Sequence, residues 1–357
     1  MIIRINPLDT FFFRDGKPFD MGDESWADGV FPPSPSVIYG ALRTLFFAHN
    51  GKLDLSKEKL DELTEDFRIR GIFLQIENIF YFPIPNDVVK NKETGQLSFL
   101  QLKDIPAYSS CKTNKMLYTS DISEEVKGLT SRINFKNILS KQNLNQVEAK
   151  EKGYLYKEAK VGIARNKTSK TSEEGRLYRV EMQRLQENTK IVVAFENLEL
   201  PKKYISKIGG EGKTFSYELE NIEIPENGFI ECPSESEIEN NTFRVCLTTP
   251  ALFKNGWLPS WIDENTLIGT FPKSTLKKST LKVKLLTTAL GKPISLGGFD
   301  VKNGQPKEMN KYVPAGSVYY FEILEGTYQE AIQAFHFKSI SEYETAKEGF
   351  GITYIGK

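Results

Sequence analysis

Strand-like segments occur along this chain of 357 residues in two rounds, and both rounds end in the same way. A short helical segment, 201–208 in the first round and 327–335 in the second, leads through a glycine-bearing loop. The chain then enters a last strand, at 213–224 and at 352–356 respectively. An internal duplication of one unit explains this recurrence more simply than two unrelated domains.

The first round begins with a strand at 2–5 and a helix at 37–49, where apolar residues recur at helical spacing. Two consecutive strands at 71–85 are rich in the β-branched and aromatic residues that strands favour. Further strands are indicated at 176–185 and 189–198. With the helix and strand described above, the first half follows the β-α-β-β-α-β order of a ferredoxin-like unit.

The intervening residues, about 86–174, are polar and lysine-rich with weak helical stretches, and they are too many for a loop. We therefore expect an insertion there. The second round is predicted to contain strands at 242–250, 281–290 and 317–324, a short helix at 260–269 and a glycine-containing hairpin at 294–307. The expected fold is α+β, with two tandem ferredoxin-like (RRM-like) domains at 1–225 and 240–357.

Charge is balanced overall but separated locally. The chain has 47 basic and 47 acidic residues, which excludes a globally basic nucleic-acid binder. Six lysines and no acid lie in 273–292, whereas eight glutamates and no base lie in 218–239. These runs indicate either two ordinary solvated faces or a basic surface for RNA phosphate and an acidic one directed elsewhere.

The composition is that of a globular protein in a reducing cytosol. The three cysteines, Cys111, Cys232 and Cys246, are scattered and lack zinc-ligand spacing. The N-terminus lacks the apolar run of a signal peptide, and no stretch approaches the roughly 20 apolar residues that span a bilayer. We expect no metal, no cofactor and no contact with a membrane.

One loop combines three glycines with a lysine: Gly209, Gly210, Glu211, Gly212 and Lys213. Although Thr214 completes a GKT triplet, Lys207 stands where a nucleotide-binding P-loop requires its first glycine. The glycines instead permit positive φ and bring main-chain N–H groups close to a phosphate. The alternative is a tight turn between a helix and a strand.

Two further segments carry cations suited to RNA. Asp15-Gly16 predicts a hairpin turn flanked by Arg14 and Lys17. Hydroxyl residues surround the second set, Arg165, Lys167 and Lys170, a composition that suits phosphate and sugar oxygens. This second segment is either a flexible solvated loop or is presented over a sheet face, where single-stranded RNA stacks on aromatic side chains.

Candidates for catalysis are few, because only His49 and His336 are present. His336 follows an apolar helix and is expected to be structural. Tyr39, His49 and Lys52 form the one set that could cleave RNA through its 2′-hydroxyl. The alternative for His49 is a histidine at a helix C-terminus, favoured by the helix dipole.

Seven motifs in register connect the sequence to a known family: PLDTFFFRDGKPF, PPSPSVIYGALRT, GIARNKT with EGRLY, IGGEGKT, GKPISLGGFD, VPAGSVYYFE and GFGITYIG. Together they resemble the third subunit of the Cmr complex, a type III-B CRISPR effector subunit of the repeat-associated mysterious protein (RAMP) superfamily. The resemblance runs from residue 4 to 356 and is interrupted mainly by the insertion.

The resemblance implies two ferredoxin-like domains, recognition of the 5′ handle of the guide RNA, and no nuclease activity. It also implies docking to the large polymerase-like subunit and to the neighbouring backbone subunit. By position, the glycine-rich loop of the superfamily matches 209–213, and its second copy matches Gly349 and Gly351.

The predicted function is a non-catalytic RNA-binding subunit. The predicted phosphate contacts are Arg14, Lys17, Arg43, Arg165, Lys167, Lys170 and Lys213. Gly297, Gly298 and Phe299 form a second predicted loop near RNA or a partner. Two alternatives stay open: a metal-independent endoribonuclease that processes CRISPR repeat RNA, and a structural bridge whose basic residues face protein partners.

Overall fold

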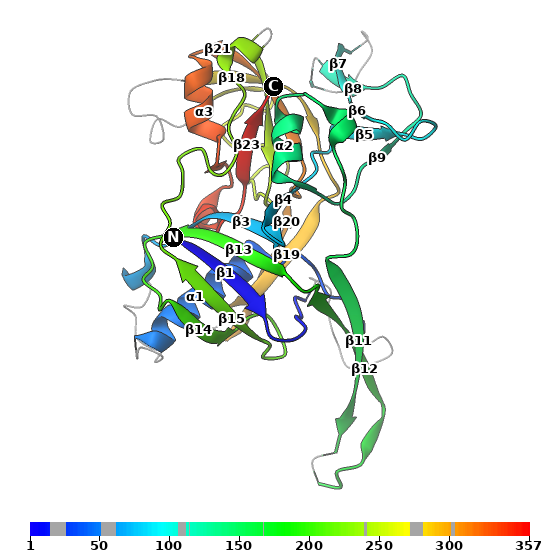
Figure 1. Ribbon diagram of the computed structural model, residues 1–357, viewed down its shortest axis with the longest axis vertical. Coiled ribbons are helices and arrows are strands. Elements are labelled where there is room, and N and C mark those ends of the chain that lie inside the picture. The colour runs from blue at the N-terminus through cyan, green and yellow to red at the C-terminus, as the bar shows by residue number, and fades with distance from the viewer. Residues whose placement is uncertain are drawn as a thin grey trace.

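The computed structural model describes residues 1–14, 26–50, 62–105, 112–113, 115–166, 168–238, 241–271, 281–300 and 304–357. The described chain is a strand-rich mixed α/β structure with two large sheets and few helices (Figure 1). Several predicted features lie outside the described residues: the Asp15-Gly16 turn, Lys17, Lys52, Cys111, Lys167 and the part of the lysine run at 272–280.

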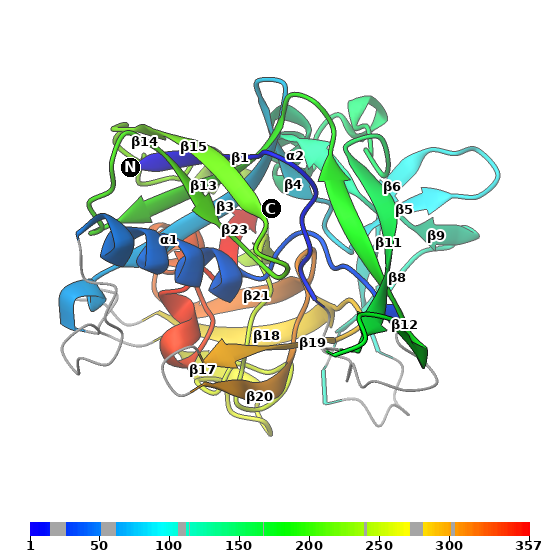
Figure 2. The same ribbon diagram turned by 90° about the horizontal axis from the view of Figure 1, so that it is seen from below.

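The first sheet has the strand order β10-β4-β3-β13-β1-β15-β14. Its strands are β1 (Ile2–Pro7), β3 (Arg68–Ile76), β4 (Ile79–Pro83), β10 (Leu129–Ser131), β13 (Thr189–Glu196), β14 (Lys203–Lys207) and β15 (Thr214–Glu220). Helix α1 (Pro35–His49) lies along one face of this sheet (Figure 2). Pro35 preorganises its first turn, and Ile38, Leu42 and Leu45 bury its apolar stripe against the strands.

The second sheet has the order β17-β18-β21-β16-β23-β22. Its strands are β16 (Thr242–Leu247), β17 (Ile268–Thr270), β18 (Lys282–Ala289), β21 (Val318–Glu325), β22 (Lys338–Ser339) and β23 (Ile352–Gly356). Helix α3 (Tyr328–Phe335) packs on its outer face, and a capping box between Thr327 and Glu330 begins the helix. The predicted helix at 327–335 is thus confirmed.

The two sheets share a third hydrophobic core. The first sheet contributes Ile2, Phe73 and Val192, and the second contributes Tyr320 and Tyr354, each no more than 3% exposed. Because this core lies between the two sheets, the aromatic side chains that form it, such as Phe73, Tyr320 and Tyr354, are buried. RNA therefore has no access to the sheet faces in this shared region.

The described part of the predicted insertion consists mostly of strands. It forms a small sheet of β5 (Val88–Asn91), β6 (Leu97–Phe99) and β9 (Ser123–Glu125), and a hairpin of β7 (Gln101–Asp104) and β8 (Lys115–Tyr118). Helix α2 (Arg132–Leu139) follows β10. A long hairpin of β11 (Leu155–Arg165) and β12 (Ser172–Leu185), which we call the arm, then projects from the body and pairs with β2 (Trp26–Ala27) (Figure 1).

Two predicted helices are absent. Residues 203–207 form the edge strand β14, in which Tyr204 lies opposite Tyr217 of β15. Residues 260–269 form turns that lead into β17, because the Asp263 carboxylate accepts hydrogen bonds from the N–H groups of Asn265 and Thr266. Such local bonds to an aspartate compete with helical hydrogen bonding.

Candidate nucleic-acid interface

Three segments that are distant in sequence meet at one end of the first sheet. Residues 8–14 leave β1 and run between the loop 208–213, which joins β14 to β15, and the base of the arm. The Gly210 N–H donates to the Phe12 carbonyl over 2.9 Å. On the other side, Phe11 and Gln183 exchange two main-chain hydrogen bonds of 2.6 and 2.8 Å. These bonds fix the glycine loop relative to the arm.

The glycine loop is a solvent-exposed hairpin between two strands, not the predicted connection from helix to strand. Gly209, Glu211 and Gly212 all have positive φ, at 71°, 59° and 62°. A Cβ at position 209 would lie 2.6 Å from the Phe12 carbonyl oxygen, so only glycine fits there. Within the described residues, the N–H groups of Glu211 and Gly212 have no acceptor. Consecutive exposed N–H groups of this kind attract anions.

Charged side chains around this loop form a matched network. The Asp9 carboxylate accepts from Lys213 over 2.9 Å and from Arg184 over 3.2 Å. The hydrogen bond from Lys213 lowers the pKa of Asp9 below its ordinary value. Arg184 also pairs with Glu158, and Lys160 pairs with Glu211 over 3.0 Å. Each of these cations therefore has a carboxylate partner, and Lys213 is held by Asp9 beneath the loop.

The arm ends in a turn closed by Asn166, whose side-chain oxygen accepts from the N–H groups of Thr168 and Ser169. Lys170 is exposed in this turn, with φ of 62°. Arg165 lies at the end of β11, and its side chain is outside the described set. Along the arm, the Tyr178 ring lies across Gly162, where a Cβ would be 2.2 Å from the ring. Lys170 thus lies at the arm tip, and Arg165 ends the strand that leads to it.

The other predicted contacts are spread over the molecule. Arg14 is exposed and bridges to Gly29 beside the base of the arm, so it belongs to the same end of the sheet. Arg43 lies on α1, where its Nε donates to Thr64 over 2.9 Å and its guanidinium covers the Phe47 ring. Gly297 and Gly298 lie at a bulge in the two-stranded sheet of β19 (Ile294–Asp300) and β20 (Gln305–Tyr312), and the side chain of Phe299 is outside the described set.

The second glycine pair is turned inward. Gly349 and Gly351 are buried, and a Cβ at position 349 would lie 2.6 Å from Ile69 of β3. The N–H of Gly351 donates to the Pro250 carbonyl over 2.6 Å. Gly349 permits the close approach of the two halves, whereas Gly351 packs against Ser341 within the second half. Burial separates both glycines from the candidate interface. The predicted pair of equivalent RNA-facing bends is therefore reduced to the single loop 208–213.

Two residues of the alternative catalytic set, Tyr39 and His49, lie apart, and the third, Lys52, is outside the described residues. Tyr39 is 5% exposed and stacks on Phe67 at a centroid distance of 4.5 Å. His49 is exposed ten residues further along α1, about 15 Å along the helix axis. His336 is buried in hydrogen bonds, as expected for a structural histidine. No cluster of three or more potential metal ligands occurs in the described part of the chain.

Two solved structures have a similar fold. A chain of the type III-B Cmr-beta structure bound to cognate target RNA and AMPPnP matches with a TM-score of 0.54 and 17% identity, over 90% of this chain and 86% of that one. A second Cmr-beta structure, bound to cognate target RNA, matches with a TM-score of 0.53, the same identity and the same coverage. The fold is thus that of a CRISPR effector subunit.

The family follows from sequence. The model of the family described as CRISPR-associated protein (Cas_Cmr3) matches residues 3–357, so the chain belongs to this family. The resemblance drawn from the seven motifs is confirmed. No curated protein matches the sequence. None of the helices within the described ranges has the length and hydropathy needed to span a bilayer.

Proposed function

We propose that this protein is a non-catalytic subunit of a type III-B Cmr effector complex that holds the 5′ handle of the guide RNA. The handle contacts the loop 208–213, Arg14 and the arm tip, while other surfaces dock the large polymerase-like subunit and the backbone subunit. One observation carries the proposal: the N–H groups of Glu211 and Gly212 stand exposed where the loop, residues 8–14 and the arm meet.

The strand orders support two tandem ferredoxin-like units, at 1–225 and 240–357. In the first half, the order β15-β1-β13-β3 has the fourth, first, third and second strands of such a unit side by side. In the second half, β23-β16-β21-β18 repeats this order. Within the described residues, each unit has a helix at one of the two positions expected of this order: α1 after the first strand in one unit, and α3 after the third strand in the other.

The division of roles follows from chemistry. Main-chain amides of the loop bind phosphate without reading a base. The phosphate must come close to the backbone, and Gly209 and Gly212 allow this because they carry no side chain. The arm tip adds the exposed Lys170, and the predicted contact Arg165 ends β11 on the same projecting element, which can follow an RNA strand. Lys167, the third predicted contact of this segment, lies outside the described residues. Because the shared core buries much of the sheet faces, the RNA path runs along the end of the first sheet.

The test is binding of handle-bearing RNA by the purified subunit at several salt concentrations. Lys170→Gln and Lys213→Gln are each expected to weaken binding and to reduce the salt slope by about 0.7 per lost phosphate contact. Lys282→Gln is the matched control, because Lys282 pairs with Glu325 on the second sheet. Equal affinity for an unrelated RNA of the same length would rule out specific recognition of the handle. Unchanged RNA binding by both Lys170→Gln and Lys213→Gln would rule out the proposed binding site.

The endoribonuclease alternative gains no support from the separation of Tyr39 and His49. It would prevail if the purified protein cut repeat RNA in chelator and His49→Ala abolished the cutting. A purely structural bridge would prevail if the subunit formed no crosslink to RNA inside the assembled complex.

A further inference from the structure

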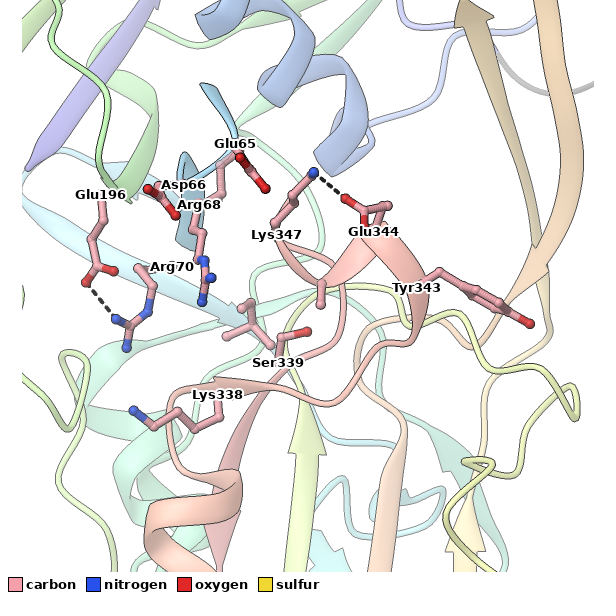
Figure 3. A pocket seen from close by; sticks show the side chains of 13 residues that line it. Glu65, Asp66, Arg68, Arg70, Glu196, Lys338, Ser339, Tyr343, Glu344 and Lys347 are labelled. Carbon is pink, nitrogen blue, oxygen red and sulfur yellow. Dashed lines mark hydrogen bonds and ion pairs between the residues drawn. The ribbon is translucent and has the colours of Figure 1, made fainter. Parts of the chain in front are cut away.

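A cleft of about 610 Å³ lies between the two halves. It is bounded on one side by the start of β3, with Arg68 and Arg70, and on the other by β22, with Lys338 and Ser339 (Figure 3). Residues 343–347 close a third side.

This cleft is remote from the glycine loop. Arg68 of β3 lies opposite Glu196 of β13 in the strand register of the first sheet. The neighbouring strands β1 and β15 bring Ile2 and Glu220 to that same end. The loop 208–213 follows the opposite end, where Pro7 pairs with Phe215. Any ligand of the cleft therefore occupies a place distinct from the interface described above.

The cations of the cleft are only partly matched by carboxylates. Arg70 donates to Glu196 over 2.6 Å, and Lys347 pairs with Glu344. In the described part of the chain, no hydrogen bond or ion pair engages the Arg68 guanidinium or the Lys338 ammonium. The acids Glu65 and Asp66 line the upper part of the view in Figure 3, apart from Lys338.

Lys338 is the most unusual of these groups because it is half-buried. Burial is the main cause that lowers its pKa, and the neighbouring positive charge of Arg70 lowers it further, while Glu226 and Glu196 oppose the change. Lys338 is thus a half-buried cation beside Arg70, and Arg70 is already paired with Glu196. An anion that enters the cleft stabilises the charged form of Lys338. The neutral Ser339 hydroxyl donates to the Phe350 carbonyl and is not a partner of Lys338.

We propose that the cleft binds a phosphate ester, with Arg68 and Lys338 as its principal contacts and the remaining N–H groups of Arg70 as a third. Arg68 and Lys338, which no carboxylate of the described residues engages, suit a phosphate because a guanidinium with a nearby ammonium supplies both planar and point-like donors. The volume lies within the range of sites for ligands of nucleotide size. The phosphate belongs either to a free nucleotide or to the backbone of a nucleic-acid strand.

Equilibrium dialysis of the full chain tests the proposal with two probes, adenosine 5′-monophosphate and a short single-stranded RNA without terminal phosphates. The first carries a phosphomonoester and the second only phosphodiesters, so the tighter probe identifies the source. Arg68→Gln and Lys338→Gln are each expected to weaken that probe by about tenfold or more, the effect of losing one hydrogen bond to a charged group. Lys347→Gln, altered in the same cleft but at a lysine paired with Glu344, is expected to bind as the wild type does.

Thermal melting of all variants establishes that they are folded before binding is compared. The proposal is overturned if the wild type binds neither probe, if Arg68→Gln and Lys338→Gln bind as tightly as the wild type, or if Lys347→Gln loses as much affinity as they do. Handle binding is read separately with Lys170→Gln and Lys213→Gln, so failure of the cleft leaves the proposed function untouched.

Discussion

The Arg244 guanidinium donates a hydrogen bond of 2.6 Å to the Asp87 carboxylate, and neither side chain is exposed to solvent at all. Arg244 comes from β16, and Asp87 lies between β4 and β5. The same guanidinium also donates to the Ile138 carbonyl at the end of α2, and Tyr320 donates to Asp87 over 2.7 Å. This pair therefore ties the inserted region to the second sheet.

Asp87→Asn is expected to lower the free energy of unfolding by about 3–5 kcal/mol, because it leaves the buried charge of Arg244 without its counter-ion. Urea unfolding monitored by circular dichroism measures the change. Asp104→Asn is the control, since Asp104 is 83% exposed in its pair with Lys115, and it is expected to cost less than about 1 kcal/mol. Equal losses in the two variants would show that burial does not govern the Arg244 pair.

His336 is expected to make stability depend on pH. Its Nε2 bonds to the Ile230 carbonyl over 2.8 Å, and its Nδ1 accepts from the Ile355 N–H. Burial lowers the pKa of His336 below the value of 6.5 that it regains on unfolding. Below that pH the unfolded state binds the proton more readily, so stability falls as the pH drops.

Between pH 7.5 and 5.5, this histidine is expected to remove up to about 1.4 kcal/mol from the free energy of unfolding. His336→Asn is less stable at both pH values but lacks this component of the pH dependence. Urea unfolding of the two proteins at both pH values isolates the difference. Parallel pH profiles would contradict the assignment.

Gly209→Ala and Gly212→Ala form a matched pair. Both positions have positive φ, so each alanine is expected to cost about 1–2 kcal/mol. At position 209 the new Cβ also meets the Phe12 carbonyl, whereas position 212 has open space within 4 Å. Gly209→Ala is therefore expected to cost about 1–3 kcal/mol more in thermal or urea unfolding. Equal costs would mean that the contact with Phe12 does not constrain the loop.

Asp9→Asn is expected to tighten RNA binding. The substitution removes the carboxylate that competes with phosphate for Lys213. Because Lys213 contacts phosphate in both proteins, the affinity is expected to rise at every salt concentration, while the salt slope of binding to single-stranded RNA changes by less than about 0.7, the value for one contact. Filter binding across a salt series measures this slope, with Asp104→Asn on the remote β7–β8 hairpin as the control. Weaker binding would show that Asp9 positions the loop more than it neutralises Lys213.

Local signals in the sequence predicted some elements well. Apolar residues at helical spacing indicated α1, and the helical segment predicted at 327–335 is α3. The junction between β3 and β4 falls at Glu77, which has φ of 58°. In each case, the residues that determine the element lie within one or two turns of it.

Other features depend on contacts between distant residues, and these were not predicted. The segment 203–207 is a strand because β15 offers it a partner edge, and no local signal distinguishes that outcome from a short helix. The Arg244 pair joins positions 157 residues apart. Its one local sign is an arginine within the apolar strand TFRVCL, where a buried cation requires a counter-ion.

The candidate site shows the same division. The glycine loop was predicted from composition, whereas its position beside residues 8–14 and the arm depends on hydrogen bonds to Phe12 and Gln183. The inward position of Gly349 depends on Ile69, which belongs to the other half. Glycine content indicates where a backbone can bend closely but does not say which surface it approaches.

Ultraviolet crosslinking of the assembled particle tests most directly whether this subunit holds the guide handle. A photoreactive nucleotide is placed at each position of the handle in turn, and mass spectrometry identifies the linked peptides. The account predicts crosslinks to the loop 208–213 and to the arm turn 166–171. Crosslinks confined to other surfaces of this subunit, or their absence from it, would contradict the account.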